Sequence, residues 1–450
     1  MKKDLTTGNV TKTMLLFAGP MILGNLLQQC YNIVDMLIVG RALGAGALAA
    51  VGSAYSLMTF LTSVLIGMCM GSGSLFSYSI GKRDTARLQY EMTASFSFIG
   101  IVTIVMNIVV FVCMKPILNI LQIPEDIYGM MQEYVWYIFW GIFFVFLYNY
   151  FSFLLRAAGD SVVSLVFLGI SSGLNIVLDL WMVAGLGLGV FGAALATLIA
   201  QGISAVFSFL IFLYRMRRYK CQFEWFDGQE LYSMLQIAIP SVLQQSTVSI
   251  GMMIVQAVVN PFGTQALAGY SATMRVENVF SLIFVSIGNA ISPYISQNLG
   301  AKKIERLKKG YHAALVLDLC FAVLAFLVIE SLHNQISSLF LGKDGTALAY
   351  QVSGDYMRWL GYFFIFMGIK MATDGVLRGL GIMRPFLIAN MVNLAIRLSV
   401  ALICAPRFGI AFVWLAVPAG WLANFLISYA ALRKSWPIEE DKGAISCRKY

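Results

Sequence analysis

Hydrophobic and polar positions alternate along this chain in long blocks. Apolar runs of about 20 residues recur from residue 14 to residue 432, and each is long enough to cross a hydrocarbon core of about 30 Å. Short turns that carry glycine or charge separate most of these runs. The pattern predicts twelve membrane-spanning helices, near residues 14–39, 47–80, 91–114, 130–155, 161–184, 190–214, 234–260, 266–298, 311–332, 350–377, 383–405 and 408–432. A basic leader precedes the first run, but no small-residue cleavage site follows it, so we expect this helix to be retained.

Composition supports the same class. Of 450 residues, 59% are hydrophobic and only 12% are charged, whereas a soluble chain has about 25% charge. We therefore expect an all-α integral membrane protein. The seven cysteines form no CxxC pair and there are only two histidines, so we expect no disulfide, no cysteine or histidine metal centre and no cofactor. No HExxH or GxSxG motif occurs, so we do not expect an enzyme.

The net charge of +9 indicates orientation. Most of the 31 Lys and Arg residues fall in the tails and loops that the predicted topology places on one side of the membrane. The opposite side has only Arg41, Lys115, Lys343 and Arg407. This asymmetry predicts a multi-pass protein of the cell membrane with both termini in the cytoplasm. No RNA or DNA motif accompanies the charge, so nucleic acid is not an expected partner.

The two halves of the chain resemble each other. Four segments recur at an offset that stays between 219 and 222 residues: "MLLFAGP" and "MLQIAIP", "GAGALAAVGSAYSL" and "GTQALAGYSATMRV", "SIGKRD" and "NLGAKK", and "LLRAAGD" and "VLRGLGI". Six spans in each half make the halves parallel repeats, with a substrate site expected between them. We predict an N-terminal lobe over 1–213, a cytoplasmic linker over 214–233, a C-terminal lobe over 234–432 and a cytoplasmic tail over 433–450.

Two acidic residues break the repeat. Asp35 has Val255 as its counterpart, and Asp179 has Ala401. An ionisable side chain at mid-membrane costs about 2.5–3.5 kcal/mol on insertion scales. The shared scaffold does not need either carboxylate, so we interpret both as functional. The alternative is that each is a structural polar group bonded to a neighbouring helix.

Helical spacing groups these acids with other polar residues. The first span has a polar stripe, the fifth span has a second one, and the sixth span adds a hydroxyl. The stripes consist of Asn25, Gln28, Asn32 and Asp35, of Ser172, Asn175 and Asp179, and of Thr197. If these helices are neighbours, they enclose a polar pocket. Its oxygens suit Na⁺, and a desolvated carboxylate can equally hold a proton.

The second half has its own polar residues. Lys370 and Asp374 are four apart and share a helical face. With Arg397 they form either a self-neutralising network or, at Asp374, a second cation or substrate contact. We expect Asp318, Arg275 and Glu277 to be structural. The predicted substrate cavity is lined by Gln28, Asn32, Gln245, Gln256, Trp359 and Asp374.

The sequence resembles the multidrug and toxic compound extrusion (MATE) family over essentially all of residues 10–432. The resemblance is carried by Pro20, "NIVDMLIVGRALGAGALAAVG", "LLRAAGDS", "LNIVLDLWMVAGLGLGVFGAALAT", "MRVENVF" and "SQNLGA". It implies two six-helix lobes around a central cavity and extrusion of compounds in exchange for Na⁺ or H⁺. It also implies an N-lobe cation site at Asp35, Asn175, Asp179 and Thr197, and a bend of the first helix near Pro20.

The chain departs from one branch of that family. Members of this branch have a glutamate on helix 7, where this chain reads "PSVLQQSTVSIG" without an acid. Asp374 matches a family aspartate on helix 10. We therefore expect coupling in the N-lobe of a monomer that exports cationic, amphipathic compounds. The alternative is a lipid-linked saccharide flippase of the wider superfamily, which should have more basic residues inside its spans.

Overall fold

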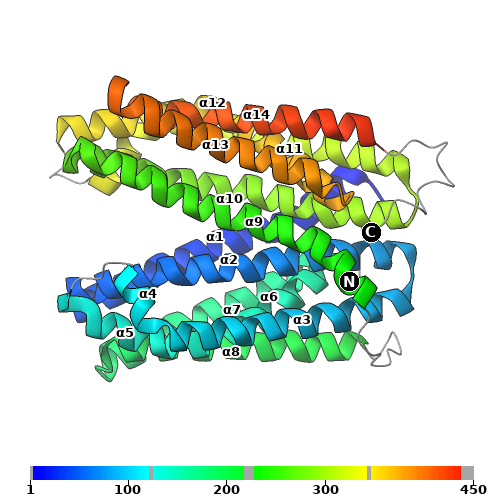
Figure 1. Cartoon of the computed structure of the whole chain (residues 1–450), viewed down its shortest axis with the longest axis horizontal. Helices are drawn as coiled ribbons and strands as arrows, with labels where there is room; N and C mark the ends of the chain where they lie inside the picture. Colours follow the sequence, from blue (N-terminus) through cyan, green and yellow to red (C-terminus); the bar gives the residue numbers. More distant parts are fainter. Residues whose placement is uncertain (1–3, 121–124, 217–227, 342–345, 437–450) are drawn as a thin grey trace. The chain divides into compact units, whose positions relative to one another are not determined.

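The structure, a computed structural model, describes residues 4–120, 125–216, 228–341 and 346–436, which are helical almost throughout (Figure 1). The first half forms α1 (Val10–Leu43), α2 (Ala45–Lys82), α3 (Thr85–Val112), α4 (Met114–Ile120), α5 (Glu125–Trp140), α6 (Ile142–Ala157), α7 (Ser161–Asp179), the π-helical turn η1 (Leu180–Gly185) and α8 (Gly189–Met216). The second half forms α9 (Gly228–Val259), the 3-10 turn η3 (Asn260–Phe262), α10 (Thr264–Gly300), α11 (Ile304–Leu341), α12 (Ala347–Gly379), α13 (Met383–Phe408) and α14 (Ala411–Ser435).

The helices have the length and surface of membrane spans. Among the described residues, eleven are long and apolar enough to cross a membrane, and α5 with α6 makes a twelfth span bent by 44°. Ile101, Ile104 and Ile108 of α3 lie on one face and are each more than half exposed, which suits contact with lipid. The predicted all-α membrane fold is confirmed.

A glycine lies at the bend in the fourth span, which the apolar pattern predicted as one helix over 130–155. The break falls at Gly141, between α5 and α6. A Cβ at this position would lie 3.0 Å from the Ile138 carbonyl oxygen and 3.4 Å from Gln201 Oε1 of α8. A side chain at this position would therefore press on the previous turn, whereas its contact with α8 would be an ordinary one.

The chain forms two compact units, whose boundaries fall inside two helices. As far as the structure describes them, one unit contains Met1–Asp4 and Leu23–Val242, and the other contains Leu5–Ile22 and Leu243–Tyr450. Both α1 and α9 change unit two residues after an internal proline, Pro20 or Pro240. Proline lacks the N–H that would bond within the helix, so each boundary lies where the helix is weakest.

Basic residues between α10 and α11 hold the segment that precedes α1. The guanidinium of Arg306 donates to the carbonyl oxygens of Thr7 (3.1 Å) and Gly8 (2.8 Å). Lys303 Nζ donates to the Thr6 carbonyl oxygen at 2.7 Å. The start of α1 is therefore fixed within the second unit by charge-assisted hydrogen bonds.

The first unit holds the start of α9 in a corresponding way. Arg87 of α3 forms an ion pair with Glu230, in the first turn of α9, with Nε 3.2 Å from Oε1. Arg87 also pairs with Glu91 at 3.1 Å. At the repeat offset of 219, Arg87 is the counterpart of Arg306. Equivalent arginines therefore hold the start of each repeat's first helix.

Glycines bring α10 and α12 close together inside the second unit. A Cβ at Gly288 would lie 2.6 Å from the Met371 carbonyl oxygen, and one at Gly379 would lie 2.7 Å from that of Ser292. Only glycine allows the backbones to approach this closely. The crossing buries the second half of α12, including its charged side chains.

Some predicted features lie outside the described residues. These are residues 217–227 of the predicted linker, residues 437–450 of the predicted tail, and Cys221 and Cys447 within them. The five cysteines that the structure describes are all unpaired.

Candidate functional site

The structure brings the two acids of the first half together. The Asp35 carboxyl on α1 and the Asp179 carboxyl on α7 lie within electrostatic range of each other. Asp179 is completely buried and Asp35 is half-buried. Ionised carboxylates only accept hydrogen bonds, so two that face each other repel unless a proton or a cation offsets their charge.

Several oxygens at this site have no hydrogen-bond donor. Among the described residues nothing donates to Asp35 Oδ1, to either carboxylate oxygen of Asp179 or to Asn175 Oδ1. Asn175 lies one turn before Asp179, and its Nδ2 donates to Thr197 Oγ1 on α8 at 3.3 Å. Leaving a buried acceptor unpaired costs about 1–3 kcal/mol. These oxygens are the groups that a bound cation or proton would satisfy.

Asp179 ends α7, and the π-helical turn η1 follows it directly. Single π turns interrupt the regular hydrogen bonding of a helix and are frequent at functional sites. The apolar pattern predicted one helix over 161–184 and gave no sign of this turn, apart from the "GLGLG" segment after it.

Other polar groups near the acids were not predicted from the sequence. The phenols of Tyr31 on α1 and Tyr134 on α5 are within electrostatic range of both carboxylates. Gln201 lies one turn after Thr197 on α8, and its buried Oε1 has no donor in the described chain. Tyr31 shares a helical face with Asp35, which is a usable signal. The sequence gave no signal for Tyr134, because the periodicity within one helix does not show which neighbouring helix a side chain faces.

The residues predicted to line the substrate cavity have varied surroundings. Gln28 is exposed, and Asn32 donates to Gln29 Oε1 (3.1 Å) and to the Tyr55 hydroxyl (3.4 Å). Gln245 is half-buried, and Gln256 donates to Asn260 Oδ1 at 3.3 Å.

Trp359 is half-buried, and its indole N–H has no acceptor among the described residues. It precedes Asp374 on α12 by about 22 Å at 1.5 Å per residue. The two cannot touch the same small group. The lining of the cavity by these side chains stays a prediction.

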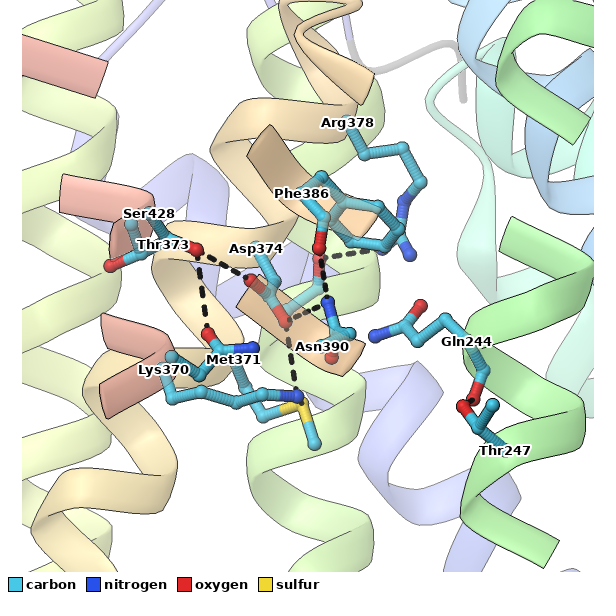
Figure 2. Close-up of polar contacts among 12 residues, drawn as sticks. Gln244, Thr247, Lys370, Met371, Thr373, Asp374, Arg378, Phe386, Asn390 and Ser428 are labelled. Atoms are coloured by element: carbon cyan, nitrogen blue, oxygen red, sulfur yellow. Dashed lines mark hydrogen bonds and ion pairs between the residues drawn. The ribbon is translucent and has the colours of Figure 1, made fainter. Parts of the chain in front are cut away.

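Asp374 lies in a buried polar cluster of the second unit (Figure 2). Lys370 Nζ is 3.0 Å from Asp374 Oδ2, which forms the i, i+4 pair expected from the sequence. Asn390 of α13 donates to the same oxygen at 3.2 Å, and Ser428 of α14 donates to Oδ1 at 3.3 Å. One carboxylate thus connects three helices.

Arg378 continues the charged face of α12 but turns toward α10. Its guanidinium donates to Ser292 Oγ (3.3 Å), Asn289 Oδ1 (3.0 Å) and the Gly288 carbonyl oxygen (3.3 Å). It is also within electrostatic range of Asp374. Arg378 was not predicted as a site residue, because it falls in a segment expected to be a turn.

Two further buried acids have different surroundings. Glu277 accepts a hydrogen bond from the Tyr356 hydroxyl and is within electrostatic range of Arg397. Arg397 was expected near Asp374, and its place beside Glu277 gives that acid a partner. Asp318 of α11 is 1% exposed, and no described residue donates to either of its carboxylate oxygens.

Long apolar helices, an internal repeat and buried acids confined to particular helices define a multi-pass membrane transporter. The MatE family model matches the chain twice, over residues 20–181 and 240–403. The double match shows independently that the two halves are copies of one unit. The chain belongs to the MatE family, and it is therefore a transporter and not an enzyme.

Individual relatives and solved structures agree with this assignment. The probable multidrug resistance protein YoeA of Bacillus subtilis is 28% identical over 443 residues, 95% of this chain and 94% of that protein. YpnP of the same organism is 27% identical over 394 residues, 87% of each chain. A mutant of the MATE transporter VcmN of Vibrio cholerae has a TM-score of 0.88 at 21% identity, covering 97% of this chain and 98% of that one. A crystal structure of MATE in a bent conformation has a TM-score of 0.89 at 22% identity, covering 98% of each chain.

Proposed function

We propose that this transporter is an antiporter that exports cationic, amphipathic compounds in exchange for Na⁺ or H⁺. The coupling cation binds at Asp35, Asn175, Asp179 and Thr197. Export proceeds by alternating access, so that the cavity faces one side of the membrane at a time.

One observation carries this proposal: a buried and a half-buried carboxylate face each other with no donor to offset them. An empty site of this kind has unpaired acceptors and repelling charges, whereas a loaded site has neither. Cation binding therefore changes the relative free energies of the conformations that enclose the site, which coupling requires. The coupling cation can then enter the cell as the exported compound leaves it, instead of both moving in the same direction.

The names of relatives support the substrate class. YoeA and YpnP are named probable multidrug resistance proteins. MepA of Staphylococcus haemolyticus, named a multidrug export protein, is 26% identical over 387 residues. Acidic and aromatic side chains attract organic cations. Flipping of lipid-linked saccharides is the alternative, and it is less well supported because Arg378 and Lys370 are already bonded within the second unit.

We also propose that each six-helix repeat acts as one lobe of a monomer with both termini in the cytoplasm. The basic turn between α10 and α11, which includes Lys303 and Arg306, supports this orientation. A fluorescent protein that folds only in the cytoplasm, fused after the last residue, should be fluorescent. A dark fusion that is still inserted would contradict the orientation.

The main test uses Asp35→Asn. Cells that express this variant should accumulate ethidium like cells without the transporter, although the protein reaches the membrane in normal amounts. Asp160→Asn is the matched control, because Asp160 caps α7 through the Val163 N–H and asparagine caps equally well. Normal export by Asp35→Asn would refute the proposed site.

Two liposome experiments separate the remaining alternatives. Counterflow of a fluorescent cation, driven in turn by a sodium gradient and by a pH gradient, identifies the coupling ion. Transbilayer movement of a labelled lipid-linked saccharide, measured in the same vesicles, tests the flippase alternative. Lipid movement without cation export would replace the proposed function.

A further inference from the structure

The surroundings of Asp374 differ in kind from those of Asp35 and Asp179. Three donors face Asp374: an ammonium from Lys370, an amide N–H₂ from Asn390 and a hydroxyl from Ser428 (Figure 2). Both of its oxygens are therefore in use. At the Asp35–Asp179 site the unpaired groups are acceptors. The Lys370 ammonium, which can only donate, already contacts the carboxylate as a cation would, and the amide and the hydroxyl direct hydrogens at it.

Comparison of the two repeats shows that the Lys370–Asp374 ion pair is present in the second half only. At the local offset of 222, Lys370 corresponds to Tyr148 and Asp374 to Ser152. Both positions are neutral in the first copy. At these two positions the second copy therefore has an ammonium and a carboxylate in contact with each other where the first copy has neutral side chains. The net charge of the two positions is the same in both copies. The first copy has two extra carboxylates, Asp35 and Asp179, that face each other instead of a base.

We propose that Lys370 is a tethered counter-ion that fills the place of an exchangeable cation at Asp374. The chain then carries one exchangeable cation site, at Asp35 and Asp179, and Lys370 determines that number. This inference rests on the proposed antiport function. It also makes Asp374 a latent site: removal of the ammonium leaves a buried carboxylate that binds a cation or a proton from solution.

The electrostatics of the cluster agree with this role. The side chains of Lys370 and Asp374 are only 4% and 3% exposed, so water screens their interaction weakly. Arg378 adds a second positive charge within range, while the residues through which α13 and α14 bond to Asp374 are the neutral Asn390 and Ser428. A mobile cation that entered would meet two fixed positive charges and one negative charge, and it would be repelled.

The test measures the cation dependence of thermal stability on purified full-length protein. The melting temperature is compared in sodium and in N-methylglucamine at equal ionic strength, and at two pH values. All variants are made in an Asp179→Asn background, which removes the first cation site. Adding Lys370→Met should create a rise of about 3 °C with sodium or with acid. Adding Lys370→Arg, the charge-preserving control, should not.

A triple variant assigns the new dependence to Asp374. Adding Asp374→Asn to the Lys370→Met protein should abolish the rise. If Lys370→Met creates no cation dependence, the inference is wrong. If Asp179→Asn alone still responds to cations, the proposed coupling site fails separately. In that case Asp374→Asn is added to the Asp179→Asn protein with Lys370 intact. If the cation response of the melting temperature then disappears, the inference is wrong.

A second measurement does not depend on the stability of a buried unpaired charge. The double variant Lys370→Met with Asp374→Asn restores the neutral state of the first repeat, and it should fold. The number of cations that it binds per chain, measured on the purified protein without substrate, should equal that of the unaltered protein. A lower number would show that Asp374 carries an exchangeable cation despite Lys370.

Discussion

Replacing Asp179 by asparagine should inactivate the transporter and stabilise it at the same time. Asp179 is completely buried, faces Asp35 and has no hydrogen-bond donor on either oxygen within the described chain. The substitution removes one charge from this pair and supplies an N–H₂ group that can donate to Asp35. It also removes a negative charge that the coupling cation needs.

The size of the effect follows from the geometry. Two unit charges at a separation of about 4 Å, a distance typical of side chains in contact, repel by about 4 kcal/mol at an effective dielectric constant of about 20. The new hydrogen bond contributes about 1 kcal/mol, and part of the repulsion is screened because Asp35 is half-buried. Burial of the new amide opposes these gains. We expect a net stabilisation of about 2 kcal/mol, which is about 2 °C in melting temperature for a chain of 450 residues.

The assay is thermal unfolding of purified protein in sodium-free buffer at high pH, where the unaltered site is empty. Asp179→Asn should melt at a higher temperature than the unaltered chain, and neither sodium nor acid should raise it further. Transport driven by either gradient should be lost. A lower melting temperature for the variant in sodium-free buffer would refute the view that the empty site is strained by facing charges.

Three further predictions concern stability. Arg306→Ala should lower the melting temperature, because it removes hydrogen bonds to the segment before α1 that contribute about 2 kcal/mol. The control is Lys309→Ala, which removes an exposed ion pair and should change the melting temperature little. Gly375→Ala should cost about 3 kcal/mol or prevent folding, because its Cβ would overlap the Gly288 carbonyl oxygen; good expression of this variant would contradict the close helix crossing. Asp84→Ala should cost about 1 kcal/mol, because the Asp84 carboxylate caps α3 by accepting the Arg87 backbone N–H. That hydrogen bond, and after it the one from Lys82, lowers the pKa of Asp84. The cap therefore stabilises the fold fully above the unfolded pKa of Asp84, and this stabilisation is lost as the pH falls through the lower folded pKa. If the melting temperature falls with acid in the same way in both proteins, this explanation is refuted.

Much of the fold could be predicted from the sequence, because the apolar composition and the length of a segment are enough to identify a membrane span. The bend at Gly141 could not, because a glycine inside an apolar run does not by itself show that the helix breaks there. The short helix α4 was missed for a related reason: seven residues are too few to show a period.

The candidate site was partly predictable. Spacing along each helix placed Asp35 with Asn32, and Asn175 with Asp179. The second repeat has Val255 and Ala401 at the positions of the two acids, which indicated that the scaffold does not need them. The facing of α1 and α7 depends on tertiary packing, so Tyr134 was missed. Arg397 was grouped with Asp374 on helix adjacency alone, whereas the structure places it near Glu277.

The contact that holds the start of α1 also has a consequence for biosynthesis. Arg306 bonds to Gly8 across 298 residues of sequence, and the ribosome makes about 5–20 residues per second. Residues 5–8 therefore wait about 15–60 seconds for the arginine that receives them. Throughout that interval residues 5–8 lack the side chain that later holds them, so the start of α1 becomes fixed only after α10 has been synthesised.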